Sequence, residues 1–185
     1  MIVGLLGLQG AFRDHIPHLD RCGAAHRVVR AAIDLDGIDR LIIPGGESTV
    51  MAKFIDEFGL AAPLRQRIGA GMPVWGICAG AIILAEGVDG GPGPLGLLPI
   101  SVKRNAYGRQ IASDTRLIDI AVLDAKAYPA IFIRSPRIVS IADGVTIHAE
   151  RDEDPVFVQK GRIMATTFHP ELNPDDPFHR YFLSL

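Results

Sequence analysis

The strongest constraint on the fold is the alternation of short apolar runs with helical segments in the first half of the chain. These runs have the length of buried strands, and turn-forming glycine or proline residues follow several of them. The expected strands are residues 2–8, 27–29, 40–44 and 73–77, and the expected helices are residues 11–21, 49–58, 63–70 and 79–85. This alternation predicts βαβ units, and therefore a mostly parallel sheet with helices on both faces.

The second half of the chain has a different pattern. A Gly/Pro loop at residues 90–96 precedes several short strand-like runs, and residues 175–183 are expected to form a closing helix. The runs are residues 97–102, 117–122, 130–133, 145–150, 156–159 and 162–168. They either extend the sheet or form a small antiparallel layer beside it. Since no repeat or long linker divides the chain, we expect one domain over residues 1–185, with a three-layer α/β/α architecture.

Composition narrows the class of protein. The 185 residues carry a formal net charge of -2, which offers no electrostatic case for a nucleic acid or a membrane surface as partner. The two cysteines do not make a disulfide framework, and the apolar opening residues lack the basic leader of a signal peptide. We therefore expect a cytoplasmic protein.

The sequence offers no metal or cofactor motif. It has no zinc-type Cys/His spacing, no P-loop and no G-x-G-x-x-G fingerprint, so we expect no metal and no cofactor. His15 and His18 are three residues apart, but a third ligand is not evident. We therefore expect ordinary structural roles for His15 and His18. We expect the same for His26, His148 and His179, which stand alone in the sequence.

The sharpest local motif surrounds Cys78. A predicted strand enters Gly76-Ile77-Cys78-Ala79-Gly80, and a predicted helix follows, which is the nucleophile-elbow pattern with cysteine in place of serine. Glycines two residues before and after relieve the crowding of such a turn. A thiol at this position points out of the turn, and the N–H of Ala79 is placed to bind a developing oxyanion. The alternative is a buried core cysteine between two turn glycines.

A cysteine nucleophile requires a base, and His169 has the best context among the histidines. It lies at the end of an apolar strand, where active sites form in α/β sheets. Glu171 follows two residues later, across Pro170, so the carboxylate is able to orient the imidazole and set its tautomer. Taken alone, these residues favour the ordinary interpretation of a strand-end histidine and a solvated carboxylate. Together with the elbow, they predict a Cys78, His169, Glu171 triad.

A second strand-to-helix turn carries the residues Pro44-Gly45-Gly46-Glu47-Ser48. Paired glycines expose backbone N–H groups, which suit an oxyanion or a substrate carboxylate. Ser48 is the expected N-cap of the following helix. A plain glycine turn is the alternative interpretation of this segment.

These motifs, in this order, resemble the glutaminase-subunit family of pyridoxal 5′-phosphate synthases, which are class I, triad-type glutamine amidotransferases. The resemblance runs from residue 2 to the expected closing helix. Its elements are G-L-Q-G (7–10), P-G-G-E-S-T (44–49), W-G-I-C-A-G (75–80), R-N-A-Y-G-R-Q (104–110), I-F-I-R-S-P (131–136) and F-H-P-E-L (168–172). The elbow and the H-P-E segment are shared by many class I amidotransferases, whereas the G-L-Q-G, P-G-G-E-S-T and R-N-x-x-G-R-Q segments, in this order, point to the vitamin B6 branch. Ile77 departs from the threonine expected before the cysteine.

The resemblance implies a flavodoxin-like fold and a role for each site residue. Cys78 is expected to attack the glutamine carboxamide, with His169 and Glu171 moving the proton. Gly46 and Ala79 are the expected oxyanion donors. The expected contacts to L-glutamine come from Gly46, Glu47, Ser48, Arg104, Ile133 and Arg134. The two arginines suit the substrate's α-carboxylate because a guanidinium pairs well with a carboxylate.

The resemblance also implies a protein partner. In this family, ammonia passes through a channel into a (β/α)8-barrel synthase subunit, which uses it to make pyridoxal phosphate. The glutaminase is weak until the synthase docks, and Gln9 is predicted to sense that docking. Two alternatives remain open at this point: the glutaminase subunit of another biosynthetic amidotransferase, and an inactive subunit that only regulates a synthase.

Overall fold

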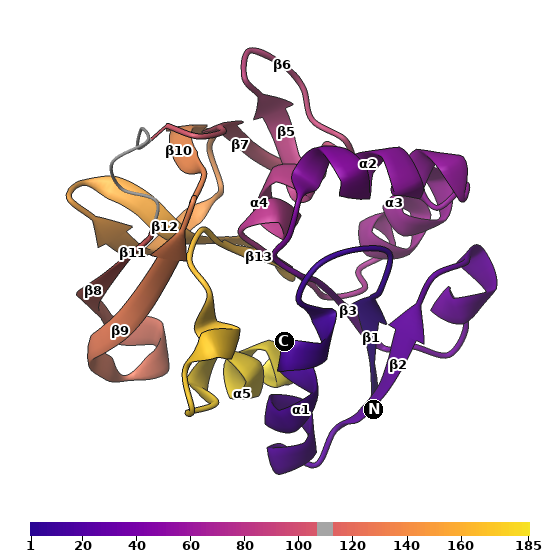
Figure 1. Ribbon diagram of the computed structural model, residues 1–185, viewed down its shortest axis with the longest axis horizontal. Helices are drawn as coiled ribbons and strands as arrows, with labels where there is room; N and C mark the ends of the chain where they lie inside the picture. The colour runs from indigo at the N-terminus through magenta and orange to yellow at the C-terminus, as the bar shows by residue number, and fades with distance from the viewer. Residues whose placement is uncertain (107–112) are drawn as a thin grey trace.

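The computed structural model describes residues 1–106 and 113–185, and its centre is a seven-stranded sheet (Figure 1). Its strand order is β11-β12-β13-β4-β3-β1-β2. The five strands of this order from β13 to β2 are parallel to one another, whereas β12 runs antiparallel to β13, and β11 runs antiparallel to β12. The bounds are β1 Ile2–Leu6, β2 Ala25–Val29, β3 Arg40–Ile43, β4 Val74–Ile77, β11 Thr146–Arg151, β12 Asp154–Lys160 and β13 Ile163–Thr166. The order β2-β1-β3-β4-β13 is that of a flavodoxin-like sheet.

Helices cover both faces of this sheet (Figure 1). One face carries α2 (Ser48–Glu57), α3 (Ala61–Gly69) and α4 (Ala79–Leu84), and the other carries α1 (Ile16–Arg21) and α5 (Pro177–Ser184). Successive strand residues point to opposite faces. In β3, Leu41 and Ile43 pack with α2, α3 and α4, while Ile42 packs with α1 and α5. The sheet therefore separates two apolar cores, and the expected three-layer α/β/α fold is confirmed.

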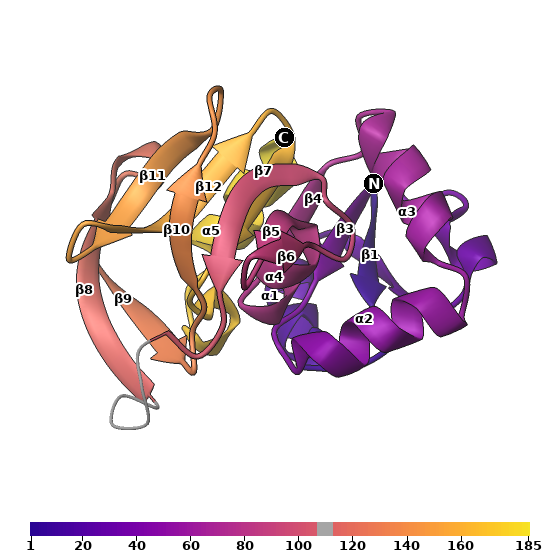
Figure 2. The ribbon, with the colours of Figure 1, turned by 90° about the horizontal axis from the view of Figure 1, so that it is seen from above.

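The remaining strands lie beside the central sheet (Figure 2). A four-stranded sheet has the order β10-β7-β5-β6, and β8 pairs with β9 in an antiparallel ribbon. Their bounds are β5 Ala85–Val88, β6 Gly91–Pro92, β7 Leu98–Lys103, β8 Ser113–Ile120, β9 Ala125–Ile133 and β10 Arg137–Ile141. The second half of the chain thus both extends the central sheet and builds layers beside it. The sequence pattern had not indicated strands at β5, β6 or β10.

Pro17 explains the form of the first helical segment, which was expected over residues 11–21. The structure has a 3-10 turn, η1 (Phe12–His15), and α1 begins only at Ile16. Pro17 lies in the first turn of α1, where its missing N–H costs no intrahelical hydrogen bond. The other 3-10 turns are η2 (Ala32–Leu35), η3 (Ala121–Leu123) and η4 (Pro170–Leu172).

Candidate active site

Cys78 sits at the junction of β4 and α4 in a strained backbone conformation. Its φ of 49° and ψ of -98° lie outside the regions that L-residues prefer, and such a conformation costs roughly 1–3 kcal/mol. The Cys78 N–H donates to the carbonyl of Thr166, 2.8 Å away on the neighbouring strand β13. The side chain is 7% exposed, and its Sγ lies 3.9 Å from the carbonyl oxygen of Ile133.

The two elbow glycines are required because backbone passes directly over them. A Cβ on Gly76 would lie 2.5 Å from the carbonyl oxygen of Gly80. A Cβ on Gly80 would collide with the carbonyl oxygen of Ile43 at the end of β3. Any side chain at either position would push α4 away from the sheet and displace Cys78.

His169 and Glu171 come together through the short turn that follows β13. The His169 N–H donates to Ile131 of β9, 2.9 Å away, which ties the turn to the ribbon. Pro170 opens the 3-10 turn η4, and this turn brings Oε1 of Glu171 to 2.8 Å from Nδ1 of His169. The Glu171 side chain is fully buried, so the carboxylate is held beside the imidazole and away from water.

The protonation of His169 depends on its two neighbours. Burial disfavours the imidazolium, but hydrogen bonds to Cys78 and Glu171 outweigh burial and raise the pKa of His169 to about 10. Burial also acts to raise the pKa of Glu171, yet the hydrogen bond from His169 and the nearby His15 and His169 lower it overall. This electrostatic arrangement favours an imidazolium beside a carboxylate, next to the cysteine.

The glycine turn after β3 closes around this pair of residues. A Cβ on Gly45 would lie 2.5 Å from Cε1 of His169 and 3.7 Å from Cβ of Cys78. A Cβ on Gly46 would collide with the Gln9 side chain and lie 2.9 Å from Cα of Gly10. The turn therefore approaches the candidate nucleophile and base closely, and only glycine allows that approach.

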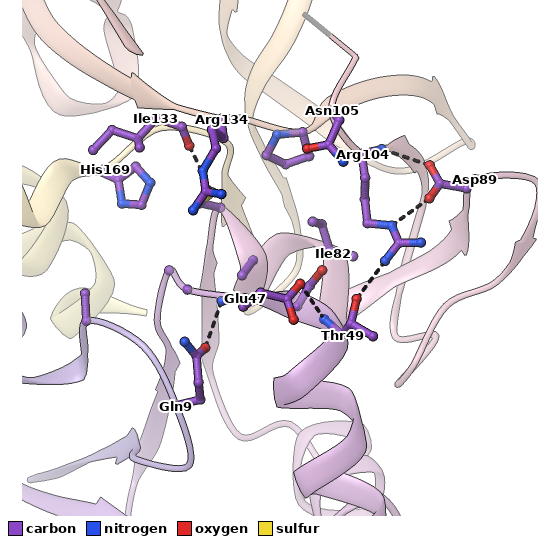
Figure 3. Close-up of a pocket in the computed structure, with 17 residues that line it drawn as sticks. Gln9, Glu47, Thr49, Ile82, Asp89, Arg104, Asn105, Ile133, Arg134 and His169 are labelled. Atoms are coloured by element: carbon purple, nitrogen blue, oxygen red, sulfur yellow. Dashed lines mark hydrogen bonds and ion pairs between the residues drawn. The ribbon is translucent and has the colours of Figure 1, made fainter. Parts of the chain in front are cut away.

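The segment after β1 holds this turn through two hydrogen bonds. The N–H of Ala11 donates to the carbonyl of Gly45 at 3.0 Å, and the N–H of Glu47 donates to Oε1 of Gln9 at 2.8 Å (Figure 3). Gln9 is thus in direct contact with the turn that contains the predicted oxyanion donor Gly46.

Glu47, and not Ser48, caps helix α2. The Glu47 carboxylate accepts from the N–H groups of Thr49 at 3.2 Å and Val50 at 2.9 Å, whereas Ser48 is the first helical residue. The hydrogen bond from Val50 contributes most to lowering the pKa of Glu47, and the bond from Thr49 adds to it. Partial burial acts in the opposite direction but is outweighed. The expectation that Ser48 is the N-cap is wrong because the longer acidic side chain reaches the orphan N–H groups from one residue earlier.

A cavity of about 570 Å³ joins these features, and the predicted nucleophile, base, oxyanion donors and substrate-binding residues all line it. Gly46, Glu47 and Ser48 line it together with Arg104, Ile133 and Arg134. Figure 3 shows Arg104 reaching Thr49 at the start of α2, next to Glu47. Glu171 does not line the cavity and sits behind His169. Arg134 has a φ of 44°, a conformation that turns the chain at the end of β9.

Asp89 is a cavity residue that sequence reasoning missed. It accepts from the N–H of Arg104 at 2.9 Å and from Nε of Arg104 at 2.6 Å, and Nη1 of Arg104 donates to Thr49 at 3.0 Å (Figure 3). The hydrogen bonds from Arg104 lower the pKa of Asp89. Residues 107–110 of the R-N-A-Y-G-R-Q segment lie outside the described residues.

Within residues 1–106 and 113–185, no group of three or more His, Cys, Asp or Glu side chains is arranged to hold a metal ion. Among the helices of that same part of the chain, none is long and apolar enough to cross a membrane. Cys22 and Cys78 are both free thiols.

Comparison with known proteins assigns the family. The profile of the SNO glutamine amidotransferase family matches residues 5–185. A protein named pyridoxal 5′-phosphate synthase subunit PdxT from Deinococcus radiodurans is 50% identical over 191 residues, which cover 100% of this chain and 97% of that protein. A protein of the same name from Pelotomaculum thermopropionicum is 47% identical over 184 residues, which cover 99% of this chain and 94% of that protein.

A solved structure supports the same assignment. The crystal structure of a glutamine amidotransferase superposes with a TM-score of 0.94 at 41% sequence identity, and the match covers 100% of this chain and 98% of that one. The family match extends over the elbow, the glycine turn and the H-P-E turn described above. The chain belongs to the SNO glutamine amidotransferase family.

Proposed function

We propose that this chain hydrolyses L-glutamine to L-glutamate and ammonia, with Cys78, His169 and Glu171 as its catalytic residues. The observation that carries the proposal is the arrangement of the elbow cysteine, the His169–Glu171 hydrogen bond of 2.8 Å and the cavity beside them. Family membership supports the same reaction. Residues 1–185 then act as one glutaminase domain.

The reaction begins when Sγ of Cys78 attacks the carboxamide carbon of glutamine. A C–S bond forms, and the carbonyl oxygen becomes an oxyanion that the N–H groups of Gly46 and Ala79 stabilise. The thiol proton, which His169 already holds as an imidazolium, passes to the departing nitrogen, so the C–N bond breaks and ammonia leaves. Water then attacks the γ-glutamyl thioester, which yields glutamate and restores the thiol.

Substrate recognition follows from the charges around the cavity. Arg104 and Arg134 line it and present guanidinium groups that suit the α-carboxylate of glutamine. Glu47 and Ser48, with Gly46, line it as well and receive the amino-acid end of the substrate, while Ile133 lines the wall beside Cys78. Glutamine is held among these residues with its carboxamide directed at Cys78.

The ammonia passes to a partner, which we propose to be a (β/α)8-barrel synthase subunit that makes pyridoxal 5′-phosphate. The names of the curated relatives support this assignment. Docking of the partner acts on the turn held by Gln9 and Ala11, and through it on the oxyanion donor Gly46. We place the complex in the cytoplasm, where free thiols such as Cys22 and Cys78 remain reduced.

The test is glutamate release from glutamine, measured with and without a barrel synthase subunit of the same family. Cys78→Ala is the inactive variant, and Cys22→Ala is the matched control because it removes the other thiol. Turnover that the partner stimulates, that Cys78→Ala abolishes and that Cys22→Ala retains is the expected result. Turnover that ignores the partner points to another amidotransferase, and no turnover in either state points to an inactive regulatory subunit.

A further inference from the structure

His18 is a buried histidine on α1 that contacts the turn carrying Glu171, although the sequence pattern predicts only an ordinary structural role for it. It is 3% exposed and does not line the substrate cavity. Nε2 of His18 lies 3.0 Å from the backbone carbonyl oxygen of Glu171, and Nδ1 lies 2.7 Å from Oδ1 of Asp176, the residue before α5. One imidazole ring therefore joins the backbone of the proposed catalytic carboxylate to the start of the last helix.

The partners of His18 determine where its protons lie. A carbonyl oxygen only accepts hydrogen bonds, so Nε2 of His18 carries a proton. The hydrogen bond from Arg21 lowers the pKa of Asp176, so this carboxylate is ionised near pH 7. If Nδ1 also carries a proton, the ring is an imidazolium paired with Asp176; if it does not, Nδ1 accepts from Nη2 of Arg21, 2.9 Å away. The donor to Glu171 is the same in both states.

The ring of His18 is held in this orientation by its neighbours. It stacks on the ring of His179 in α5, with centroids 4.2 Å apart and an angle of 2° between the planes. Nε2 of His179 in turn lies 2.9 Å from Nδ1 of His15 in η1, so the stacking partner is fixed as well. A buried ring with so little freedom defines the position of the carbonyl that it contacts.

The Glu171 side chain depends on the backbone of its turn for its position. Oε1 lies 2.8 Å from Nδ1 of His169, whereas the buried Oε2 makes no hydrogen bond within the described part of the chain. The backbone hydrogen bonds inside η4 run from Leu172 to His169 and from Asn173 to Pro170, and neither uses the carbonyl of Glu171. His18 supplies the donor for this carbonyl, which would otherwise be costly to bury.

Strand β9 holds the two ends of the same turn. The N–H of His169 donates to the carbonyl of Ile131 at 2.9 Å, and the side chain of Asn173 donates to the carbonyl of Pro129 at 3.0 Å. The contact from His18 on α1 falls between these two anchors, at the residue that bears the carboxylate. Loss of that contact would leave the middle of the turn free to shift while its ends stay in place.

We propose that His18 is a positioning residue for the proposed triad, acting through the hydrogen bond from its Nε2–H to the backbone carbonyl of Glu171. The bond fixes the backbone of η4 and, through it, the placement of the Glu171 carboxylate against His169. The imidazolium of His169 then keeps the orientation in which it gives its proton to the departing nitrogen. This inference rests on the glutaminase activity proposed above.

Two amide variants separate the contact with Glu171 from the contact with Asp176. In His18→Gln, the amide nitrogen falls near the position of Nε2 and keeps a donor for the Glu171 carbonyl. In His18→Asn, the shorter side chain places its amide near the position of Nδ1, so it keeps a partner for Asp176 and leaves the Glu171 carbonyl unpaired. His26→Asn is the matched control, because His26 lies on the edge strand β2, 3.6 Å from Asp20.

Steady-state kinetics with the synthase subunit present, and the melting temperature of each variant, test the positioning role. We expect His18→Asn to lower kcat about tenfold with an unchanged KM, since His18 does not line the cavity. We expect His18→Gln to retain most of kcat, and His26→Asn to retain all of it. A wild-type kcat in His18→Asn would overturn the proposal. So would a loss in His18→Gln as large as that in His18→Asn, because a purely structural role predicts losses that follow the melting temperature alone.

Nitrogen-15 NMR of the histidine-labelled chain provides a readout that does not depend on turnover. We expect a protonated Nε2 in His18 of the wild type. The Nδ1–H signal of His169, which reports its hydrogen bond to Glu171, should move in His18→Asn and stay in place in His18→Gln. A bare Nε2 in His18, or an unmoved His169 signal in His18→Asn, would contradict the proposal. If the wild type releases no glutamate, the proposed function fails, while these signals still decide the positioning contact.

Discussion

The guanidinium of Arg104 is held by the carboxylate of Asp89, with Nε of the arginine 2.6 Å from Oδ2 of the aspartate. Asp89 also accepts from the backbone N–H of Arg104, so it fixes both the side chain and the chain direction at this edge of the cavity. Nη1 then points at Thr49 on α2. A cavity residue outside the proposed triad therefore determines where a proposed substrate-binding charge is placed.

Replacement of Asp89 with alanine is expected to raise KM for glutamine several-fold with little change in kcat, because Arg104 loses its position and not its charge. Both side chains are more than a third exposed, so the change in unfolding free energy should stay below about 1 kcal/mol. Steady-state kinetics and a denaturant titration check the two expectations. A large drop in kcat at unchanged KM would show that Asp89 acts on the chemistry.

Gly45→Ala is expected to abolish most glutaminase activity. The new methyl group would lie 2.5 Å from the His169 ring, so either the turn or the imidazole must move. Overpacking of this kind destabilises a protein by about 1–3 kcal/mol. Gly69→Ala is the matched control: it lies in α3 with no atom near its added methyl group, and we expect full activity. Normal activity in Gly45→Ala would show that the turn is free to shift.

The His169–Glu171 pair predicts a loss of stability at alkaline pH. The pKa of His169 is raised from 6.5 to about 10 on folding, so the folded protein binds more protons than the unfolded chain between these values. The resulting contribution to the free energy of unfolding is fully present below pH 6.5 and is lost as the pH rises through about 10.

Glu171→Gln removes one of the groups that raise the pKa of His169, and its alkaline loss of stability should be shallower. Urea unfolding at a series of pH values measures both slopes, and a Gly69→Ala control, which changes no titratable group, should show the wild-type slope. Identical slopes in Glu171→Gln and wild type would contradict the charged pair.

Gln9→Ala tests the link between the partner and the oxyanion turn. The variant removes the side chain that accepts from the N–H of Glu47 at 2.8 Å and that packs on Gly46. We expect similar basal glutamate release and a clear reduction in the stimulation by the synthase subunit. Titration of the partner separates weaker docking from weaker activation, and unchanged stimulation would remove Gln9 from the proposed link.

Much of the fold was predictable because its signals are local. The strands of the parallel sheet are continuous apolar runs, and the elbow glycines stand at fixed distances from Cys78. The H-P-E spacing is equally local, since one proline places the carboxylate on the imidazole. The strand β5 was missed because AEGV carries only two apolar residues, whereas β10 was missed although RIVSI has three.

Features that depend on distant contacts were beyond sequence patterns. Asp89 is a single aspartate at the end of β5, and nothing around it indicates that Arg104, 15 residues later, folds back onto it. His15 and His179 are 164 residues apart, and only the packing of η1 against α5 brings them together. Their isolation along the chain favoured an ordinary structural interpretation.

The position of β4 in the sheet has a consequence for the chain during its synthesis. Val74–Ile77 pairs with β3 on one side and with Ile163–Thr166 on the other, and the base and its carboxylate follow that later strand. A nascent chain that has just passed residue 78 on the ribosome holds the proposed nucleophile and β3, but neither the proposed base nor β13. The proposed enzyme therefore cannot release ammonia before translation has delivered the second half of the sheet, so unfinished chains do not waste glutamine.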